Sequence, residues 1–458
     1  MTSMDIEMQV WIQDKSRKKF WVYNNKSKTL NELDILPNNI SSYYLIKYAK
    51  CVKKYGKENI ETIVNNQDRE EIKKILKKYL KEIMKNREEL LNYKDIKFDI
   101  LQGTNNSIRN LNLLPKKFFE YLLVKRIYKN INGVSKYVEE PYKYTERLEN
   151  ITIDEYNWFE DCYNGGMLYL KEPGIYNCYG YDYKNCYGSV LGNKNNTLKL
   201  NNIDYNFMIS EKCGELRTIE KLNKHLQYGF YKVKITSSNE MFNKFFHFNK
   251  NNTYTHYDIQ LARDCMNELN GIEIKLLNVE NNACVYESKK LIKAYYIFGK
   301  WFDKITELKS KMENKTLIKF LSSSLWGFLS KKNLKIINEE EMFNNIDYEY
   351  KIMDIFDKNG DNYYKILPLN KKVYNTNFRL KPFITSFVRV KMFKTIMENN
   401  LFLNVIRIHT DGIVLDTKYD FLLYDNEIIE EDKTTGTIEF KGINDYTDDF
   451  TDDFIMEG

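Results

Sequence analysis

The chain has 458 residues, of which 43% are apolar and 29% charged, a composition typical of a globular protein of two or three domains. Its 70 basic and 64 acidic side chains give a net charge of +6, which suits a lysine-rich solvated surface as well as a nucleic-acid-binding one. The absence of long apolar runs and of a basic, apolar leader predicts an intracellular protein without a membrane partner. Seven cysteines without a CxxC pair, and only four histidines, predict reduced thiols and argue against a zinc site.

Residues 1–156 are expected to form one N-terminal unit of mixed α/β character. Residues 5–23 alternate in part between apolar and polar side chains, which predicts one or two strands. A long helix is predicted over 68–91, because apolar residues recur there every three or four positions. Residues 113–131 also have a helical pattern after Pro115.

The character of the chain changes at Trp158, where Gly- and Tyr-rich, strand-like runs begin and continue to Leu191. Helical patterns follow at 258–269, 296–329 and 383–398, and a polar, aromatic stretch that resembles a hairpin insertion occupies 336–374. The second part of the chain is therefore expected to combine strands with helices.

Two carboxylates stand where strands are predicted to end. Asp182 follows a Tyr-rich run and precedes a Gly-Ser turn. Asp411 precedes Gly412 between two apolar runs, a pattern that predicts a β-hairpin with Asp411 at its tip. Taken alone, each aspartate is also explained as an ordinary turn residue.

Between these two carboxylates, three lysines recur on one face of a predicted helix. Lys311, Lys315 and Lys319 are four residues apart, so they share a face opposite an apolar stripe. Like charges at this spacing repel one another unless an anion lies among them, and a triphosphate is such an anion. A solvated basic face explains the same pattern.

The order of these segments is carboxylate, basic helix, carboxylate hairpin. Two-metal nucleotidyl transfer needs two carboxylates from different elements, which hold Mg²⁺ ions about 3.5–4 Å apart. It also needs a cationic clamp for the triphosphate. The combination therefore predicts nucleotidyl transfer more strongly than any single segment does.

The three segments resemble motifs A, B and C of the family B DNA polymerases, which read D-x-x-S-L-Y-P-S, K-x-x-x-N-S-x-Y-G and D-T-D-S. A fourth segment resembles the Y-x-G-G motif of the protein-primed branch, found in phages, adenoviruses and linear plasmids. The matching residues are Asp182, Asn185, Tyr187, Gly188 and Ser189 for motif A; Lys319, Ser323, Ser324, Trp326 and Gly327 for motif B; His409, Thr410, Asp411 and Gly412 for motif C; and Tyr163, Asn164, Gly165 and Gly166 for the fourth. The resemblance covers residues 157–418.

The resemblance implies an α+β fold, a right-hand polymerase with palm and fingers. The implied divisions are an N-terminal domain at 1–156 with a degenerate or absent exonuclease, palm at 157–295, fingers at 296–332, palm with an insertion at 333–418, and a reduced thumb or C-terminal tail at 419–458. Asp5-Ile6-Glu7 is similar to the first exonuclease motif, but no second or third motif follows. Residues 436–441 are the candidate start of a thumb, although the K-x-Y primer-binding element is not evident.

The implied activity is template-directed addition of dNTPs to a primer 3′-OH, with two Mg²⁺ ions that Mn²⁺ can replace. Asp182, Asp411 and the backbone carbonyl of Tyr183 would hold the metals, and the two aspartates are the catalytic residues. The incoming nucleotide would contact Tyr187, Lys311, Lys315, Lys319 and Ser323. Primer and template would contact Tyr163, Gly165, Gly166, Ser324, Trp326, Gly327, His409, Thr410 and Lys441. The implied partners are a DNA primer-template, dNTPs, and a terminal protein or accessory replication factor of a virus or mobile element, in a host cytoplasm or virus factory.

Three departures from the family pattern leave an alternative open. His409 replaces the first Asp of motif C, and Ser323 and Trp326 replace the Asn and Tyr of motif B. Three roles fit His409: orienting a water, contacting the primer end, or only filling the position of the missing Asp. The alternative is a non-catalytic nucleic-acid-binding protein on a degenerate palm. A reverse transcriptase fits less well, because it would carry adjacent aspartates in motif C.

Overall fold

The computed structural model divides the chain into two compact units, Met1–Leu122 with Ile305–Leu325, and Leu123–Lys304 with Trp326–Gly458. The structure describes residues 9–14, 19–24, 30–33, 43–46, 69–91, 123–131, 134–142, 149–162, 165–312, 318–319, 321–322, 334–344, 350–358, 361–368, 379–421, 428–430 and 434–447. These units do not follow the divisions at 156/157 and 295/296 expected from sequence. The assignment of palm, fingers and thumb stays a prediction.

The first unit contains a four-stranded sheet and one long helix. The strand order is β3-β2-β1-β4, with β1 antiparallel to β2 and parallel to β4. Its strands are β1 (Gln9–Asp14), β2 (Lys19–Asn24), β3 (Leu30–Leu33) and β4 (Tyr43–Ile46). Helix α3 (Arg69–Leu91) buries Ile72, Leu76 and Leu80 on the face that contacts β1 and β2. The strands and helix predicted in this part of the chain are confirmed.

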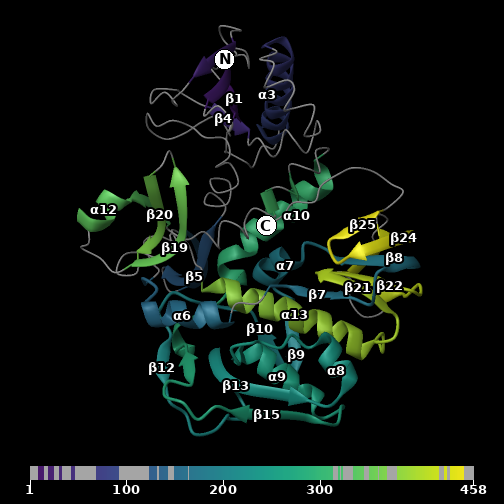
Figure 1. Cartoon of the computed structure of the whole chain (residues 1–458). Helices are drawn as coiled ribbons and strands as arrows, with labels where there is room; N and C mark the ends of the chain where they lie inside the picture. The colour runs from purple at the N-terminus through teal and green to yellow at the C-terminus, as the bar shows by residue number, and fades with distance from the viewer. Residues whose placement is uncertain are drawn as a thin grey trace. The chain divides into compact units, whose positions relative to one another are not determined.

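The second unit is built around a seven-stranded antiparallel sheet, in the order β25-β24-β8-β22-β21-β7, with β23 also on β8 (Figure 1). The strands are β7 (Met167–Leu170), β8 (Gly174–Tyr183), β21 (Val405–Thr410), β22 (Gly412–Leu415), β23 (Ile428–Glu430), β24 (Gly436–Gly442) and β25 (Asp445–Thr447). The apolar cluster on this sheet comprises Cys178, Ile406, Val414, Ile438 and Phe440.

The segment proposed as the start of a thumb lies within this sheet. Residues 436–440 pair with 178–174 of β8, the strand that carries Asp182. Ile438 and Phe440 are buried while Thr437 and Lys441 are exposed, which is the two-residue period of a strand with one face on a core. That alternation explains why the segment joins the sheet.

Helix α13 (Leu380–Glu398) separates this sheet from a second one (Figure 1). On one side, the Thr395 hydroxyl lies 2.5 Å from the Tyr183 hydroxyl of β8. On the other side, Ser386 Oγ lies 2.6 Å from Thr255 Oγ1, just before α9 (His256–Cys265). Because it is covered on both sides, α13 is apolar nearly all round, as expected for a buried helix.

The second sheet has the order β12-β16-β13-β14, and β15 pairs with β13 beyond the span of β16. Its strands are β12 (Glu215–Arg217), β13 (Gly229–Ser237), β14 (Thr253–Thr255), β15 (Ile272–Leu276) and β16 (Ala283–Val285). Phe383 of α13 contacts Tyr228 and Phe230 here, with ring centroids 4.1 and 4.5 Å apart. Aromatic packing therefore fixes α13 to this sheet.

Shorter elements complete the second unit. They are β5 (Val124–Ile131), β6 (Val134–Pro141), α6 (Ile153–Cys162), α7 (Cys186–Gly192), β9 (Thr197–Leu200), β10 (Ile203–Asn206), β11 (Met208–Ser210), α8 (Glu240–Phe245), the 3₁₀ turn Ser288–Lys290, β17 (Leu291–Lys293), β18 (Lys335–Asn338), α12 (Glu339–Asn344), β19 (Tyr350–Lys358) and β20 (Asp361–Pro368). Helix α10 (Tyr295–Lys311) begins in the second unit and ends in the first.

Most predicted elements of this unit are confirmed, but the strand-like run expected from Trp158 to Leu191 begins in helix α6 and ends in helix α7, with strands only between them. Helices lie at α9, α10 and α13, and β19 and β20 form the expected hairpin. The helix predicted over 113–131 is wrong from Val124 onward, where β5 pairs with β6. The sequence between these strands is Asn132-Gly133, a strong hairpin signal that outweighs the helical spacing. No helix in the described part of the chain is long and apolar enough to span a membrane.

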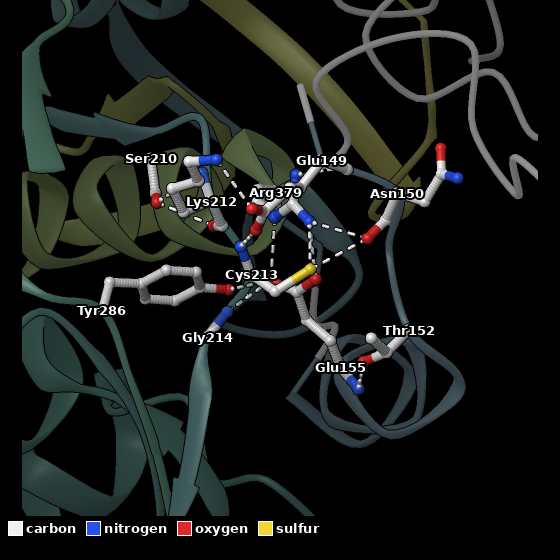
Figure 2. Close-up of polar contacts among 10 residues, drawn as sticks. All are labelled: Glu149, Asn150, Thr152, Glu155, Ser210, Lys212, Cys213, Gly214, Tyr286 and Arg379. Atoms are coloured by element: carbon white, nitrogen blue, oxygen red, sulfur yellow. Dashed lines mark hydrogen bonds and ion pairs between the residues drawn. The ribbon is translucent and has the colours of Figure 1, made fainter. Parts of the chain in front are cut away.

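A buried ion pair joins the start of α13 to α6, as Figure 2 shows. Arg379 donates from Nε to Glu155 Oε1 and from Nη2 to Glu155 Oε2, both at 2.8 Å. The Tyr286 hydroxyl also donates to Glu155 Oε1 at 2.8 Å, and Arg379 Nη1 donates to the Glu149 carbonyl at 2.9 Å. Burial alone would lower the pKa of Arg379, but the charge and hydrogen bonds of Glu155 raise it overall. Arg379 therefore keeps its charge inside the unit.

Candidate functional site

The structure brings Asp182 and Asp411 to the same end of the seven-stranded sheet. Asp182 is the next-to-last residue of β8, and antiparallel β22 sets Gly412 opposite it. The Tyr183 N–H donates to the Asp411 carbonyl at 3.2 Å. The prediction that these two segments lie side by side on one antiparallel sheet is confirmed.

The hairpin turn that presents Asp411 differs from the expected one. His409 pairs with Gly412, so Thr410 and Asp411 are the central residues and Gly412 begins β22. Thr410 has a φ of 60°, whereas Asp411 is not in the positive-φ region. A positive φ at only the first central residue is the pattern of a type II′ turn, which favours Gly at that position. A β-branched residue in this conformation stores roughly 1–3 kcal/mol of strain. Such strain, directly before a candidate catalytic residue, is typical of functional sites.

Gly412 leaves open the space beside the Asp182 carboxylate. A Cβ added at Gly412 would lie 3.8 Å from Asp182 Oδ1 and 3.6 Å from the Tyr181 carbonyl. On the hairpin itself, the Thr410 hydroxyl donates to Asp411 Oδ1 at 2.7 Å. Both carboxylates are half-buried. The turn therefore orients the Asp411 carboxylate, and a Cβ at Gly412 would lie at ordinary contact distance from the Asp182 carboxylate.

Gly166 packs directly against this turn. A Cβ added at Gly166 would come within 2.9 Å of Thr410 Cγ2 and 3.0 Å of Thr410 Cα, closer than real Cβ contacts. The next residue, Met167, pairs with Thr410 across β7 and β21. The second glycine of the Y-x-G-G match is thus needed for close approach to the motif C turn. Tyr163 lies outside the described residues.

Arg389 of α13 is hydrogen-bonded to the backbone of the Gly165–Gly166 segment. Its Nη1 donates to the Gly165 carbonyl at 2.8 Å, and its Nη2 donates to Asp258 Oδ1 at 3.2 Å. Asp258 also accepts hydrogen bonds from the Thr255 hydroxyl at 2.9 Å and from the Thr255 N–H at 3.2 Å, the second of which belongs to the capping box that starts α9. Arg389 and Asp258 are 4% exposed each, so their charges compensate each other inside the unit.

His409 has a hydrogen-bond partner on the β24–β25 turn. Its Nε2 lies 2.9 Å from Asn444 Oδ1. Burial, and then the nearby charge of Arg407, lower the pKa of His409. His409 is therefore held at the hairpin by this hydrogen bond, and its surroundings favour the neutral imidazole. Its role stays a prediction.

Tyr183, whose carbonyl is the predicted third metal ligand, is buried and fixed from α13. Its hydroxyl contacts Thr395, as described above, and Lys391 Nζ lies 4.3 Å from its ring centroid. Asn185, two residues later, has a φ of 48° and turns the chain from β8 into α7. Helix α7 then carries Tyr187, which is half-buried.

The predicted triphosphate clamp belongs to the first unit. Lys311 and Lys319 are exposed, and Lys311 Nζ forms an ion pair with Glu307 Oε1 at 2.8 Å. Lys441 on β24 is also exposed, and its Nζ lies 3.6 Å from Glu439 Oε2. The predicted residues outside the described part of the chain are Tyr163, Lys315, Ser323, Ser324, Trp326 and Gly327. Contacts of all these residues with nucleotide or DNA stay predictions.

The donor set at Asp182 and Asp411 suits Mg²⁺. Carboxylate oxygens are hard ligands, and Mg²⁺ is usually bound through one or two carboxylates together with waters and substrate phosphates. Within the described residues, no three His, Cys, Asp or Glu side chains gather into a metal-binding group. A two-carboxylate site of the Mg²⁺ kind is therefore compatible with the residues present, whereas a zinc site of several side chains is not found among them.

The two residues that support the Gly165–Gly166 segment, one on α13 and one on α9, were not predicted from the sequence. In the sequence, the signal for Arg389 is a charged residue within an apolar helical stretch. The signal for Asp258 is its place as the last residue of a Thr-x-x-Asp capping pattern. Both signals were present in the sequence. Neither indicated that the two side chains meet beneath Gly165.

No family model matches the sequence, and a search of curated proteins gives no match. Among solved structures, the chain is similar to phi29 DNA polymerase with primer-template DNA and incoming nucleotides, at 13% identity and a TM-score of 0.41, over 64% of this chain and 50% of that chain. It is also similar to phi29 DNA polymerase with single-stranded DNA, at 13% identity and a TM-score of 0.43, over 66% and 50% of the two chains. A third structure, the orthorhombic crystal form, gives 14% identity and a TM-score of 0.40. The chain spans about half the length of the solved chains that it matches.

Proposed function

We propose that this chain is a template-directed DNA polymerase that adds dNTPs to a primer hydroxyl at Asp182 and Asp411. The observation that carries the proposal is the antiparallel register that sets Gly412 opposite Asp182 and joins Tyr183 to Asp411. Motif order in the sequence and the close packing of Gly166 on the motif C turn add support. In this proposal the primer is a DNA end or a hydroxyl of a terminal protein.

Asp182 and Asp411, with the Tyr183 carbonyl, would hold two Mg²⁺ ions. Bound Mg²⁺ supplies activation of the primer hydroxyl and stabilisation of the departing pyrophosphate. The chain's own residues orient the donors: the Thr410 hydroxyl fixes Asp411 Oδ1, and α13 fixes Tyr183 through Thr395. Preorganised donors of this kind need no rearrangement when charge develops.

Primer extension with Asp182→Asn and Asp411→Asn variants tests the proposal. Each change keeps the side-chain shape but removes a charge from the metal site, so extension should fall about a thousandfold or more, equivalent to several kcal/mol of lost stabilisation. Binding of the primer-template should remain within a few-fold, because lysine and arginine contacts to phosphate dominate affinity. Asp204→Asn is the matched control, since Asp204 is an exposed aspartate on the two-stranded β9–β10 sheet.

Two results would contradict the proposal in different ways. Extension by either site variant at the rate of the Asp204→Asn control would place the chemistry elsewhere in the chain. A wild-type chain that binds primer-template DNA but extends it with neither Mg²⁺ nor Mn²⁺ would favour the alternative, a nucleic-acid-binding protein without catalysis.

A further inference from the structure

A small cavity of mixed polar and apolar lining lies in the second unit, beyond the C-terminal end of α7. Its walls come from three places: the loop that joins α7 to β9, the end of β10, and the junction of β17 with α10. Its volume is about 100 Å³. Since one water takes up about 30 Å³, the cavity has room for a group of a phosphate's size. None of the predicted site residues lines it.

The walls of the cavity are held by hydrogen bonds within the protein. Asn193 caps α7 by donating its N–H to the Ser189 carbonyl at 2.8 Å, and the buried Asn196 donates from Nδ2 to Ser189 Oγ at 2.8 Å. On the opposite wall, the Ala294 N–H donates to the Phe207 carbonyl at 2.9 Å. The cavity is therefore formed before any ligand arrives, which reduces the entropy cost of binding.

The charge of the lining favours an anion. Lys194 and Lys293 both line the cavity, and no Asp or Glu does. Both lysines are exposed, and neither side-chain ammonium group forms an ion pair or hydrogen bond with a residue that the structure describes. Two ammonium groups at one small cavity repel each other unless an anion lies between them.

The remaining lining suits one kind of anion, a phosphate that carries a base. Asn206 adds an amide side chain to the rim, and amides donate to phosphate oxygens. Tyr295 and Tyr296 add two rings whose centroids are 5.5 Å apart. Aromatic rings beside a positively charged groove are how proteins bind single-stranded nucleic acid, the rings stacking on bases while lysines contact the backbone.

We propose that this cavity binds a backbone phosphate of a single nucleic-acid strand, the template strand on its way to Asp182 and Asp411. The assignment to a template rests on the proposed function. Helix α7 follows closely after Asp182, and its seven residues span about 10 Å at about 1.5 Å per residue. The cavity lies at the far end of this helix from Asp182, and its paired tyrosine rings suit the bases of a strand.

Binding of a labelled single-stranded oligonucleotide to the full chain, followed by fluorescence anisotropy over a range of salt concentrations, tests the proposal. The Lys194→Ala/Lys293→Ala double variant should bind about tenfold or more weakly, because it cannot form the charge-assisted hydrogen bonds to phosphate. The slope of log K against log salt should fall by about 0.7 for each phosphate that the variant no longer neutralises. Thermal melting checks that the variant remains folded.

The matched control is Lys234→Ala/Lys275→Ala. These lysines are exposed, face each other across β13 and β15, and are likewise unpaired among the described residues. The control removes the same charge from the same unit and should weaken binding less than about twofold. Equal weakening by the two double variants would overturn the proposal, because the effect would then be general surface charge.

Lysine acetylation, mapped by mass spectrometry, distinguishes the source of the phosphate. The oligonucleotide should protect Lys194 and Lys293, while dNTP without metal should not. Protection by dNTP alone would overturn the assignment to a strand. The outcome is separable from the proposed function: a chain that protects these lysines but extends no primer loses the polymerase assignment only, and one that extends primers without protecting them loses this site only.

Discussion

Substituting Gly166 by alanine tests the packing that links the Y-x-G-G match to the hairpin of Asp411. The added Cβ would meet Thr410 Cγ2 at 2.9 Å and Thr410 Cα at 3.0 Å. Because one of these atoms is backbone, a side-chain rotation cannot relieve the contact. Reaching an ordinary separation of 3.4 Å requires the turn or the glycine segment to move by about half an ångström.

Such a movement affects stability and catalysis differently. Overpacking of this kind costs about 1–3 kcal/mol of folding free energy. Catalytic groups must stay within about 0.5 Å of the productive geometry, and a displacement of 1 Å can cost about a hundredfold in rate. Because Thr410 directly precedes Asp411, we expect Gly166→Ala to lower kcat for primer extension by about ten- to a hundredfold, with little change in primer-template affinity.

Gly165→Ala is the matched control, because a Cβ there would have no neighbour within 4 Å. Both variants add the same atom to adjacent glycines, so a difference between them reports the contact with Thr410. Rates are measured with saturating primer-template, alongside thermal melting. Equal kcat values for the two variants would refute the idea that close packing at Gly166 sets the position of Asp411.

Four further predictions follow from named contacts. In a denaturant titration, Glu155→Gln should destabilise the protein by about 3–5 kcal/mol, because it leaves the buried guanidinium of Arg379 without its charged partner. The control Glu140→Gln breaks a partly exposed ion pair and should cost under about 1 kcal/mol. Burial lowers the pKa of His256 from 6.5 to about 3, so the unfolded chain protonates this side chain at a higher pH than the folded chain does. The free energy of unfolding should therefore fall by about 1.4 kcal/mol per pH unit as the pH drops from 6.5 toward 3. His256→Gln should reduce this slope when unfolding is measured as a function of pH. Tyr187→Val should raise ribonucleotide incorporation in a primer-extension assay if this ring packs under the sugar, and unchanged discrimination would reassign Tyr187 to the core. Lys319→Ala should reduce kcat/KM for dNTP about tenfold because the ammonium that would bind the phosphates is removed, and normal kinetics would leave Lys319 on a solvated face.

The sequence predicted the central pairing of the site because its signals were local. Asp182 ends a strand-like run and Asp411 lies between two apolar runs, and both patterns survive in the folded protein as β8 and the β21–β22 hairpin. The same reasoning placed the turn at Asp411-Gly412, one residue too late. A threonine with positive φ is rare, so no propensity rule would select Thr410 as the first turn residue.

Other features depend on contacts between distant segments, which no periodicity reveals. The need for glycine at position 166 is visible only once β7 lies beside β21. The inclusion of β24 in the sheet depends on an edge of β8 that is open to it, and the alternation of Ile438 and Phe440 alone does not name the partner strand. The error at 124–131 is different, because the Asn-Gly hairpin signal that directly follows this stretch is local and visible in the sequence.

The hairpin turn is where the separately recognised motifs meet, and this explains how it tolerates its strain. Thr410 is packed by Gly166 on one side and bonded to Asp411 on the other, while His409 is held by Asn444. A strained residue persists when its surroundings over-determine it, and two of these three contacts, from Gly166 and from Asn444, come from distant parts of the chain. The lowered pKa of His409 has a further effect, because a neutral ring adds no charge beside Asp411. The hairpin thus carries one carboxylate, that of Asp411, so the affinity for divalent cations in the proposed site rests on Asp182 and Asp411.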